Sequence, residues 1–133
     1  IEPIDGLPVV CVDWSEAREA ELIRQFDVGV MPLADQLWEK GKCGYKLIQY
    51  MASALPVIAS PIGVNREIVE HGVDGYLAED AAAWVSALIR LIESRSLRQE
   101  MGRLGRSKVE QHYSLSVMTA RLVSAIRQSA MER

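Results

Sequence analysis

The chain has 133 residues, of which 49 % are hydrophobic and 25 % charged, and its formal net charge is −3. A length and composition of this kind predict one compact globular domain and exclude a low-complexity or disordered chain. Because the 15 basic and 18 acidic residues are interspersed, the chain offers no broad positive surface, which argues against a nucleic-acid-binding role.

No segment of the sequence predicts a membrane span or a zinc site. The longest uncharged stretches, such as 47–65, contain polar residues and two prolines and are typical of a buried helix and strand. Cys11 and Cys43 lack the CxxC or Cys/His spacing of a metal site, so we expect neither a metal nor a disulfide, as in a cytoplasmic protein. The chain begins at Ile1 without a methionine, and we therefore expect it to be a piece of a longer protein.

The first part of the chain predicts alternating strands and helices. Residues 7–12 form a valine-rich apolar run that favours a strand, and residues 16–25 have the composition of a helix. A second apolar run at 28–31 is followed by a polar loop over 33–42. A helix is then predicted from about 44 to 54, because its apolar residues recur at helical spacing.

The next elements are a central strand and a short helix. Residues 57–59 are apolar at every position, which is typical of a strand covered by helices on both faces of a parallel sheet. A turn over 60–64 follows, and Asn65 is predicted to cap a short helix over 66–70. Residues 76–78 are predicted to form the last strand.

From residue 80 onward the pattern is helical. Asp80 is predicted to cap the first of three helices, and the spacing of Ser96 and Gln99 is that of a capping box for a second helix over 97–112. The last helix is predicted to begin near Ser114 or Ser116 and to run toward Met131.

This order of elements predicts the α/β class. We expect one domain, with a Rossmann-like, doubly wound parallel sheet of about four strands in residues 1–79 and C-terminal helices in residues 80–133. Ligands of such sheets bind beyond the carboxyl ends of the strands. The loops over 13–16, 32–45 and 60–65 are therefore the candidate ligand site.

Four separate blocks of the sequence carry a family resemblance. They are DVGVMPL at 27–33, GKCGYKLIQYMA at 41–52, PVIAS at 56–60 and GVDGYL at 72–77. In this order and spacing they resemble the C-terminal, nucleotide-sugar-binding domain of the family 4 (group 1) glycosyltransferases of GT-B fold, and a looser match continues through 97–106. The resemblance implies that the chain is a truncated half of a GT-B fold.

The resemblance also implies a reaction. Enzymes of this family transfer a sugar, with retention of configuration, from a nucleotide-diphosphate sugar to an acceptor hydroxyl, without a required metal or other cofactor. The acceptor site and several catalytic groups belong to an N-terminal domain that this chain lacks, and an expected strand–helix unit with phosphate-binding Arg and Lys has no place before Leu7. We therefore expect the isolated chain to fold, to bind nucleoside diphosphate weakly and to catalyse no transfer, and its catalytic residues stay unknown.

Two glutamates of the family pattern are missing here. The family has a glutamate, seven intervening residues and a second glutamate that precedes Ala-Met-Ala. Residues 51–52 set the register, which places Gly41 and Gln49 at the two positions. The second glutamate of relatives binds the nucleotide ribose, a role that the Gln49 amide can keep because it offers donors and an acceptor. Glu39 is a candidate to replace the first, which contacts the donor sugar.

The segment around the start of the predicted helix at 44–54 completes the candidate donor site. Backbone N–H groups at a helix start favour an anion such as a diphosphate. Lys42 and Lys46 would neutralise the leaving nucleoside diphosphate. The ordinary alternatives are that both lysines are solvated surface residues and that Gln49 is a buried structural residue. The predicted donor-binding residues are Gly41, Lys42, Gly44, Tyr45, Lys46 and Gln49.

Partners and alternatives follow from the same resemblance. We expect a nucleotide sugar and the N-terminal domain of the same protein as partners, and peripheral association of the full-length enzyme with the inner face of the membrane is compatible with the family. The apolar stripe of the last helix, 116–131, would promote dimerisation without its partner domain. The alternatives are a degenerate glycosyltransferase-like domain and a non-catalytic α/β binding or signalling module such as a receiver domain. A receiver domain needs acidic residues after its first and third strands, and in this sequence only Asp13 fits that pattern loosely.

Overall fold

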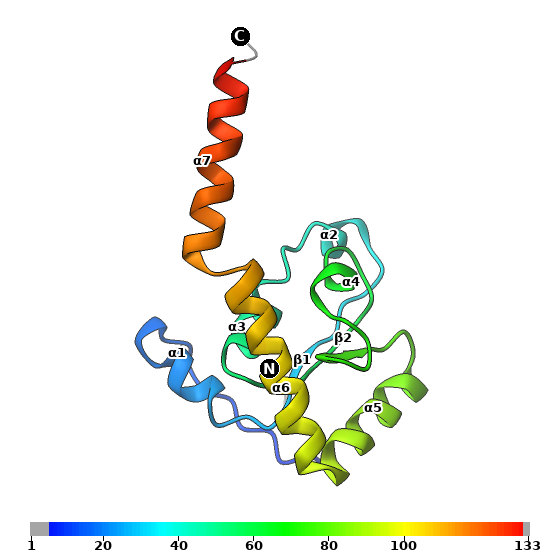
Figure 1. The fold of residues 1–133 in the computed structure, drawn as a ribbon. Helices are drawn as coiled ribbons and strands as arrows, with labels where there is room; N and C mark the ends of the chain where they lie inside the picture. Colours follow the sequence, from blue (N-terminus) through cyan, green and yellow to red (C-terminus); the bar gives the residue numbers. More distant parts are fainter. Residues whose placement is uncertain (1–5, 132–133) are drawn as a thin grey trace.

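The computed structural model describes residues 6–131 and forms a small parallel sheet surrounded by helices (Figure 1). The elements in chain order are α1 (Glu16–Ile23), β1 (Gly29–Met31), α2 (Leu37–Lys40), α3 (Tyr45–Ala52), β2 (Val57–Ala59), α4 (Asn65–Ile68), β3 (Gly75–Leu77), α5 (Ala81–Glu93), α6 (Arg95–His112) and α7 (Leu115–Met131). In the described residues the sheet has three strands in the order β1-β2-β3, all parallel. The predicted α/β class is confirmed, with three strands in place of about four.

The strand predicted at 7–12 does not form. Residues 8–15 adopt no regular structure, and Leu7 and Val10 are 60 % and 83 % exposed. An extended run becomes a stable strand only when a neighbouring strand satisfies its backbone groups. No strand of the described part of the chain pairs with this segment. The prediction of a strand is therefore wrong, because a valine-rich run favours extended backbone but does not by itself provide a neighbouring strand to pair with.

The predicted cap at Asn65 is also wrong. Val64 is the residue before α4, and Asn65 is the buried first residue of that helix. Its Nδ2 donates a hydrogen bond to the carbonyl oxygen of Ser60 at 3.0 Å. The side chain therefore joins α4 to the turn after β2 and does not satisfy a helix N–H group.

The caps of the C-terminal helices agree with the prediction in one case and differ in the other. Asp80 caps α5, because its Oδ1 accepts the N–H of Ala83 at 2.8 Å. At the start of α6 the cap is Ser94 and not Ser96, with its Oγ accepting the N–H of Leu97 at 3.2 Å. A one-turn helix, α2, lies within the segment that the sequence predicts as a loop.

The central strand β2 is fully buried, as predicted from its apolar residues. On one face of the sheet residues of α3 and α6 belong to a first buried cluster, and on the other face residues of α5, together with Met101 of α6, belong to a second. The first cluster contains Leu47, Met51, Val57, Ala59, Ile68, Val69 and Val109, and the second contains Ile58, Tyr76, Ala78, Ala87, Leu91 and Met101. Burial of each large side chain contributes about 1.5–3 kcal/mol, so these two clusters supply the main stabilisation.

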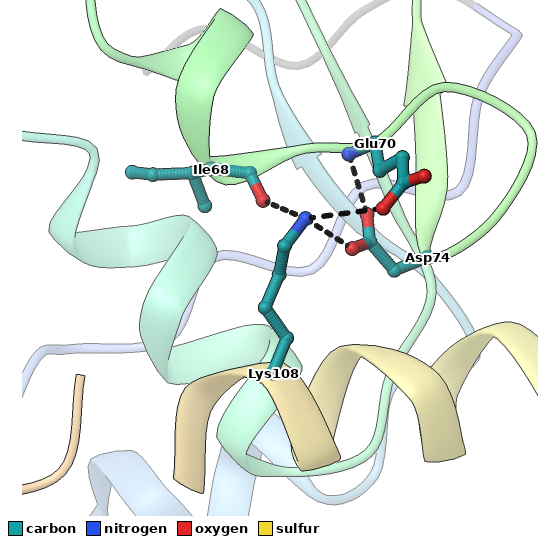
Figure 2. Close-up of polar contacts among 4 residues, drawn as sticks. All are labelled: Ile68, Glu70, Asp74 and Lys108. Carbon is teal, nitrogen blue, oxygen red and sulfur yellow. Dashed lines mark hydrogen bonds and ion pairs between the residues drawn. The ribbon is translucent and has the colours of Figure 1, made fainter. Parts of the chain in front are cut away.

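A buried ion pair fastens α6 to the loop between α4 and β3, and Figure 2 shows its contacts. Lys108 Nζ lies 2.6 Å from Asp74 Oδ2 and donates a hydrogen bond to the carbonyl oxygen of Ile68 at 2.9 Å. The other carboxylate oxygen of Asp74 accepts the N–H of Glu70 at 2.8 Å. Because the Asp74 side chain is only 3 % exposed, this charge depends on Lys108 for its compensation.

Helix α7 extends away from the rest of the domain (Figure 1). Its exposed apolar side chains are Leu115, Met118, Leu122, Val123, Ile126 and Met131. They provide an exposed apolar surface of the kind that the sequence predicts for this helix, and dimerisation through it stays a prediction. Within residues 6–131, no helix combines the length and the apolar composition that crossing a bilayer requires.

Candidate functional site

A cavity of about 680 Å³ lies at the carboxyl ends of the strands. The segments that follow β1, β2 and β3 all contribute to its wall, which is formed by Leu33, Ala34, Asp35, Lys40, Ser60, Pro61, Ile62, Gly63, Arg66 and Glu79. Its volume is in the range of small-molecule sites, and parallel sheets bind their ligands at this edge. Of the three loops predicted for the site, those over 32–45 and 60–65 line the cavity and that over 13–16 does not.

Ser60 holds the loops after β1 and β2 together. Its side chain is buried, and its Oγ accepts the N–H of Leu33 at 2.9 Å. Its own N–H donates to the carbonyl oxygen of Met31 at 3.1 Å, and its carbonyl oxygen accepts from Asn65. The loops after β1 and β2 are therefore joined to each other by the hydrogen bonds of Ser60.

Gly63 allows the turn after β2 to approach the end of α2. Its φ is +54°, and a Cβ at this position would lie 2.7 Å from the carbonyl oxygen of Lys40. Both the left-handed backbone and the close approach exclude a larger residue without a shift of α2. Gly63 therefore packs against α2 and also lines the cavity.

Two ion pairs lie in the cavity wall. Lys40 Nζ is 2.9 Å from Asp35 Oδ1, and Arg66 Nη2 is 3.4 Å from Glu79 Oε1. All four side chains are more than half exposed, and exposed pairs contribute only about 0–1 kcal/mol. An anionic or hydroxyl-rich ligand can therefore replace these contacts at small cost. Arg66 and Glu79 were not predicted from the sequence, because no motif marks them.

The predicted donor-binding residues lie between α2 and α3 and in the first turns of α3, and the cavity wall does not include them. Gly41 and Lys42 are exposed between α2 and α3, and Tyr45 and Lys46 are exposed in the first turn of α3. Gln49 is half-buried one turn further along. Their role in donor binding stays a prediction.

Gly44 is the buried member of the predicted set. Its φ is +66°, and a Cβ here would lie 2.3 Å from Ile68 Cδ1 of α4. The start of α3 therefore packs directly against α4 at Gly44 and becomes exposed only at the next residue, Tyr45. Nearby, Asn65 Oδ1 is buried and has no hydrogen-bond partner among the described residues.

Lys46 and Gln49 meet at a residue that sequence reasoning missed, Glu19 of α1. Gln49 Nε2 donates to Glu19 Oε2 at 2.8 Å, while Lys46 Nζ and Trp14 Nε1 both donate to Glu19 Oε1, the latter at 3.1 Å. The hydrogen bond from Lys46, followed by those from Gln49 and Trp14, lowers the pKa of Glu19 to about 2. Glu19 is 27 and 30 residues from these partners, and no local pattern in the sequence predicts the contact.

Glu39, the candidate replacement for the first motif glutamate, is half-buried in α2. Its Oε2 is buried and lacks a hydrogen-bond partner in the described part of the chain. Cys11 and Cys43 are exposed free thiols, and residues 6–131 contain no group of three or more His, Cys, Asp and Glu side chains suited to a metal ion.

A parallel sheet covered by helices, with a cavity at its carboxyl edge, is typical of the doubly wound α/β class. The family described as glycosyl transferases group 1 matches residues 4–94, which is more than half of the chain, and the chain belongs to this family. The predicted family is therefore confirmed.

Known relatives are much longer than this chain. It is 30 % identical over 96 residues to N-acetyl-alpha-D-glucosaminyl L-malate synthase of Bacillus anthracis, an alignment that covers 71 % of this chain and 24 % of that protein. It is 33 % identical over 76 residues to alpha-1,3/1,6-mannosyltransferase ALG2 of Homo sapiens, covering 56 % and 18 %. The chain thus spans about a quarter or less of the length of these curated relatives.

Solved structures confirm the fold. The chain is similar to sucrose-phosphate synthase from Thermosynechococcus elongatus, with a TM-score of 0.67, 24 % identity, and 80 % of this chain and 26 % of that one covered. It is also similar to the C-terminal domain of a glycosyl transferase group 1 family protein, LpcC, from Francisella tularensis, with a TM-score of 0.61, 23 % identity, and 80 % and 53 % covered. The fold is that of a GT-B glycosyltransferase domain.

Proposed function

We propose that the chain is the donor-binding part of a retaining glycosyltransferase, which moves a sugar from a nucleotide-diphosphate sugar to an acceptor hydroxyl. Family membership supports glycosyl transfer in general. The observation that carries donor binding is the cavity at the carboxyl edge of the sheet, because segments after all three strands meet there around two cations, Lys40 and Arg66.

The charges of this cavity suit a nucleotide sugar. Negative charge builds on the nucleoside diphosphate as the glycosidic bond breaks, and positive groups that face it stabilise the transition state. Lys40 and Arg66 in the wall and Lys42 on the adjoining segment would supply that positive charge. Asp35 and Glu79 would accept hydrogen bonds from sugar hydroxyls. No metal is part of the proposal.

We further propose that the chain is part of the C-terminal domain of a two-domain enzyme. The alignment with 53 % of a structure described as a C-terminal domain supports this assignment. Catalysis would then need groups from the other domain, and the isolated chain would show no transfer. In the full-length enzyme the apolar side chains of α7, such as Leu122 and Ile126, would pack against the N-terminal domain, and in its absence against a second copy.

The test of donor binding is a calorimetric titration of the chain with UDP, GDP and ADP. We expect a dissociation constant below about 1 mM for at least one of them. Replacement Arg66→Ala should weaken that binding at least about fivefold, because a charge-assisted contact is lost. Arg90→Ala, on the distant surface of α5, is the matched control and should leave it unchanged. No binding to any of the three, or equal effects of both variants, would contradict the proposal.

A second candidate is a domain that binds the nucleotide sugar without transferring it. The specific observation in its favour is that Gly41 and Gln49 replace the two family glutamates. Release of free nucleoside diphosphate from the donor by the full-length protein in the presence of acceptor would decide for the enzyme. Membership of the family leaves no support for a receiver-type signalling module.

A further inference from the structure

A separate cavity of about 200 Å³ lies between α5, β3 and the loop that precedes β3. Its wall shares no residue with the cavity at the carboxyl edge of the sheet. Ala83 and Ala87, which follow each other by one turn on α5, leave space here because their side chains are small. We call this cavity the β3-edge pocket, and the polar side chains in its wall are His71, Tyr76, Ser86 and Arg90.

The imidazole ring of His71 is held in one orientation and offers a hydrogen-bond donor. Its Nδ1 accepts the N–H of Leu77 at 3.1 Å. A neutral imidazole that accepts at one nitrogen carries its proton on the other, so Nε2 is the donor. The ring also lies edge-on to Tyr76, with ring centroids 5.5 Å apart and 74° between the ring planes. These two contacts fix the ring before any ligand binds.

The hydroxyl of Tyr76 is a second donor that the protein does not use. The residue is only 7 % exposed, and the hydroxyl forms no hydrogen bond within residues 6–131. It is not one of the polar atoms that are both unpartnered and fully buried, so it is accessible from the pocket that Tyr76 lines. A polar group that is removed from bulk water and left without a protein partner is well suited to bond a ligand.

Arg90 supplies a positive charge that no carboxylate of the described chain neutralises. None of the ion pairs among the described residues involves Arg90. The wall of the β3-edge pocket contains no aspartate or glutamate from the described residues. In the cavity at the carboxyl edge, by contrast, each cation in the wall faces an acid. The β3-edge pocket therefore combines one uncompensated cation with three neutral groups that can donate, the Ser86 hydroxyl included.

We propose that the β3-edge pocket is a binding site for a single phosphate group, which is held by the Arg90 guanidinium and by hydrogen bonds from the Tyr76 hydroxyl and His71 Nε2. A guanidinium forms paired hydrogen bonds with phosphate oxygens, and neutral donors around it complete the contacts of an anion. The volume is below the range of about 300–1,000 Å³ that is typical of small-molecule sites, so a whole nucleotide does not fit. The site is therefore distinct from the donor site and does not depend on the proposed function.

The test is an NMR titration of the isotopically labelled chain with inorganic phosphate at low ionic strength. We expect saturable amide shifts in 71–77 and 83–90. The dissociation constant should be about 1–10 mM, because the charged group is exposed to solvent. A parallel titration with glycerol 3-phosphate distinguishes the source of the group: tighter binding than that of phosphate assigns the site to a phosphate ester, and weaker binding assigns it to the free ion.

Three variants test the residues that hold the anion. Arg90→Gln should weaken phosphate binding at least about fivefold, because the charge-assisted contact is lost. Arg95→Gln is the matched control, since it removes the same charge from an exposed arginine outside the pocket and should change the affinity by less than about twofold. Tyr76→Phe removes only the hydroxyl and keeps the packing of the ring, and it should weaken binding about threefold.

Three outcomes would overturn the site. Shifts confined to 33–46 and 60–66 would mean that phosphate enters only the cavity at the carboxyl edge. Equal losses from Arg90→Gln and Arg95→Gln would mean that the anion is attracted by charge in general and not by this pocket. Unchanged binding by Tyr76→Phe would mean that the hydroxyl does not contact the anion. Failure of the chain to bind nucleoside diphosphates, in contrast, would contradict the proposed function and leave this site standing.

Discussion

Replacement of Lys108 by methionine would leave the buried carboxylate of Asp74 without its counterion. In the structure the two groups are 2.6 Å apart, and their side chains are 21 % and 3 % exposed. Loss of one partner of a buried ion pair costs about 3–5 kcal/mol. Methionine keeps most of the packing of the lysine stem, and the Glu70 N–H still binds Asp74. We therefore expect Lys108→Met to lower the free energy of unfolding by about 2–3 kcal/mol.

The assay is urea unfolding followed by far-ultraviolet circular dichroism, which gives the free energy of unfolding and its dependence on urea. Arg106→Met is the matched control on the same helix, because the Arg106–Glu110 pair is exposed at 57 % and 62 %. Exposed pairs of this spacing contribute about 0.3–0.5 kcal/mol, so the control should cost little. If Lys108→Met costs no more than Arg106→Met, the buried ion pair does not stabilise the packing of α6 against the loop between α4 and β3, and the reasoning is refuted.

Three further outcomes are expected. Gly102→Ala should destabilise the chain by more than about 2 kcal/mol in urea unfolding, because its Cβ would lie 1.9 Å from the carbonyl oxygen of Ala54. Gly105→Ala should be neutral or stabilising, because its Cβ would meet only the flexible Met51 side chain at 3.3 Å. Equal effects of the two substitutions would contradict the packing of α6. The NMR signal of the Glu19 carboxyl carbon should titrate near pH 2, and Lys46→Met should raise the pKa of Glu19. Because the pKa is lower in the folded chain, the contribution of Glu19 to the free energy of unfolding is complete above the unfolded pKa of about 4.3 and is lost as the pH falls toward 2. A titration midpoint near 4 in the intact chain would be inconsistent with the hydrogen bonds to Glu19. Asp80→Ala should cost about 1 kcal/mol in the same unfolding assay, since the cap of α5 is lost, and no change would show that the cap does not contribute.

The elements that the sequence predicts well are those whose own residues determine their environment. The run Val57–Ala59 is apolar at every position, which requires cover on both faces, and the structure buries it completely. Asp80 caps α5 because a carboxylate at that position bonds an N–H group three residues away, an interaction local in sequence.

The elements that the sequence predicts poorly depend on distant partners. The run at 7–12 has the pattern of a strand, but a strand also needs a partner, and no strand of the described residues pairs with it. Asparagine is a residue type that commonly caps helices, yet the Asn65 amide donates a hydrogen bond to the carbonyl oxygen of Ser60, because the turn after β2 folds back on α4. Local propensity cannot report such a contact.

The candidate site divides in the same way. The loops over 32–45 and 60–65 follow from the general rule for the carboxyl edge of parallel sheets. Arg66 and Glu79 enter the cavity wall only through the packing of α4 and the chain after β3. Glu19 reaches Gln49 across 30 residues, so no spacing in the sequence predicts this pair.

The most direct test of donor binding is to locate a bound nucleotide by NMR. In a titration of isotopically labelled chain with the tightest of UDP, GDP and ADP, the account predicts that the largest amide shifts fall in 33–46 and 60–66, around the cavity at the carboxyl edge of the sheet. Shifts concentrated on the outer surface of α5 around Val85 and Ile89, or no saturable shifts at all, would contradict it.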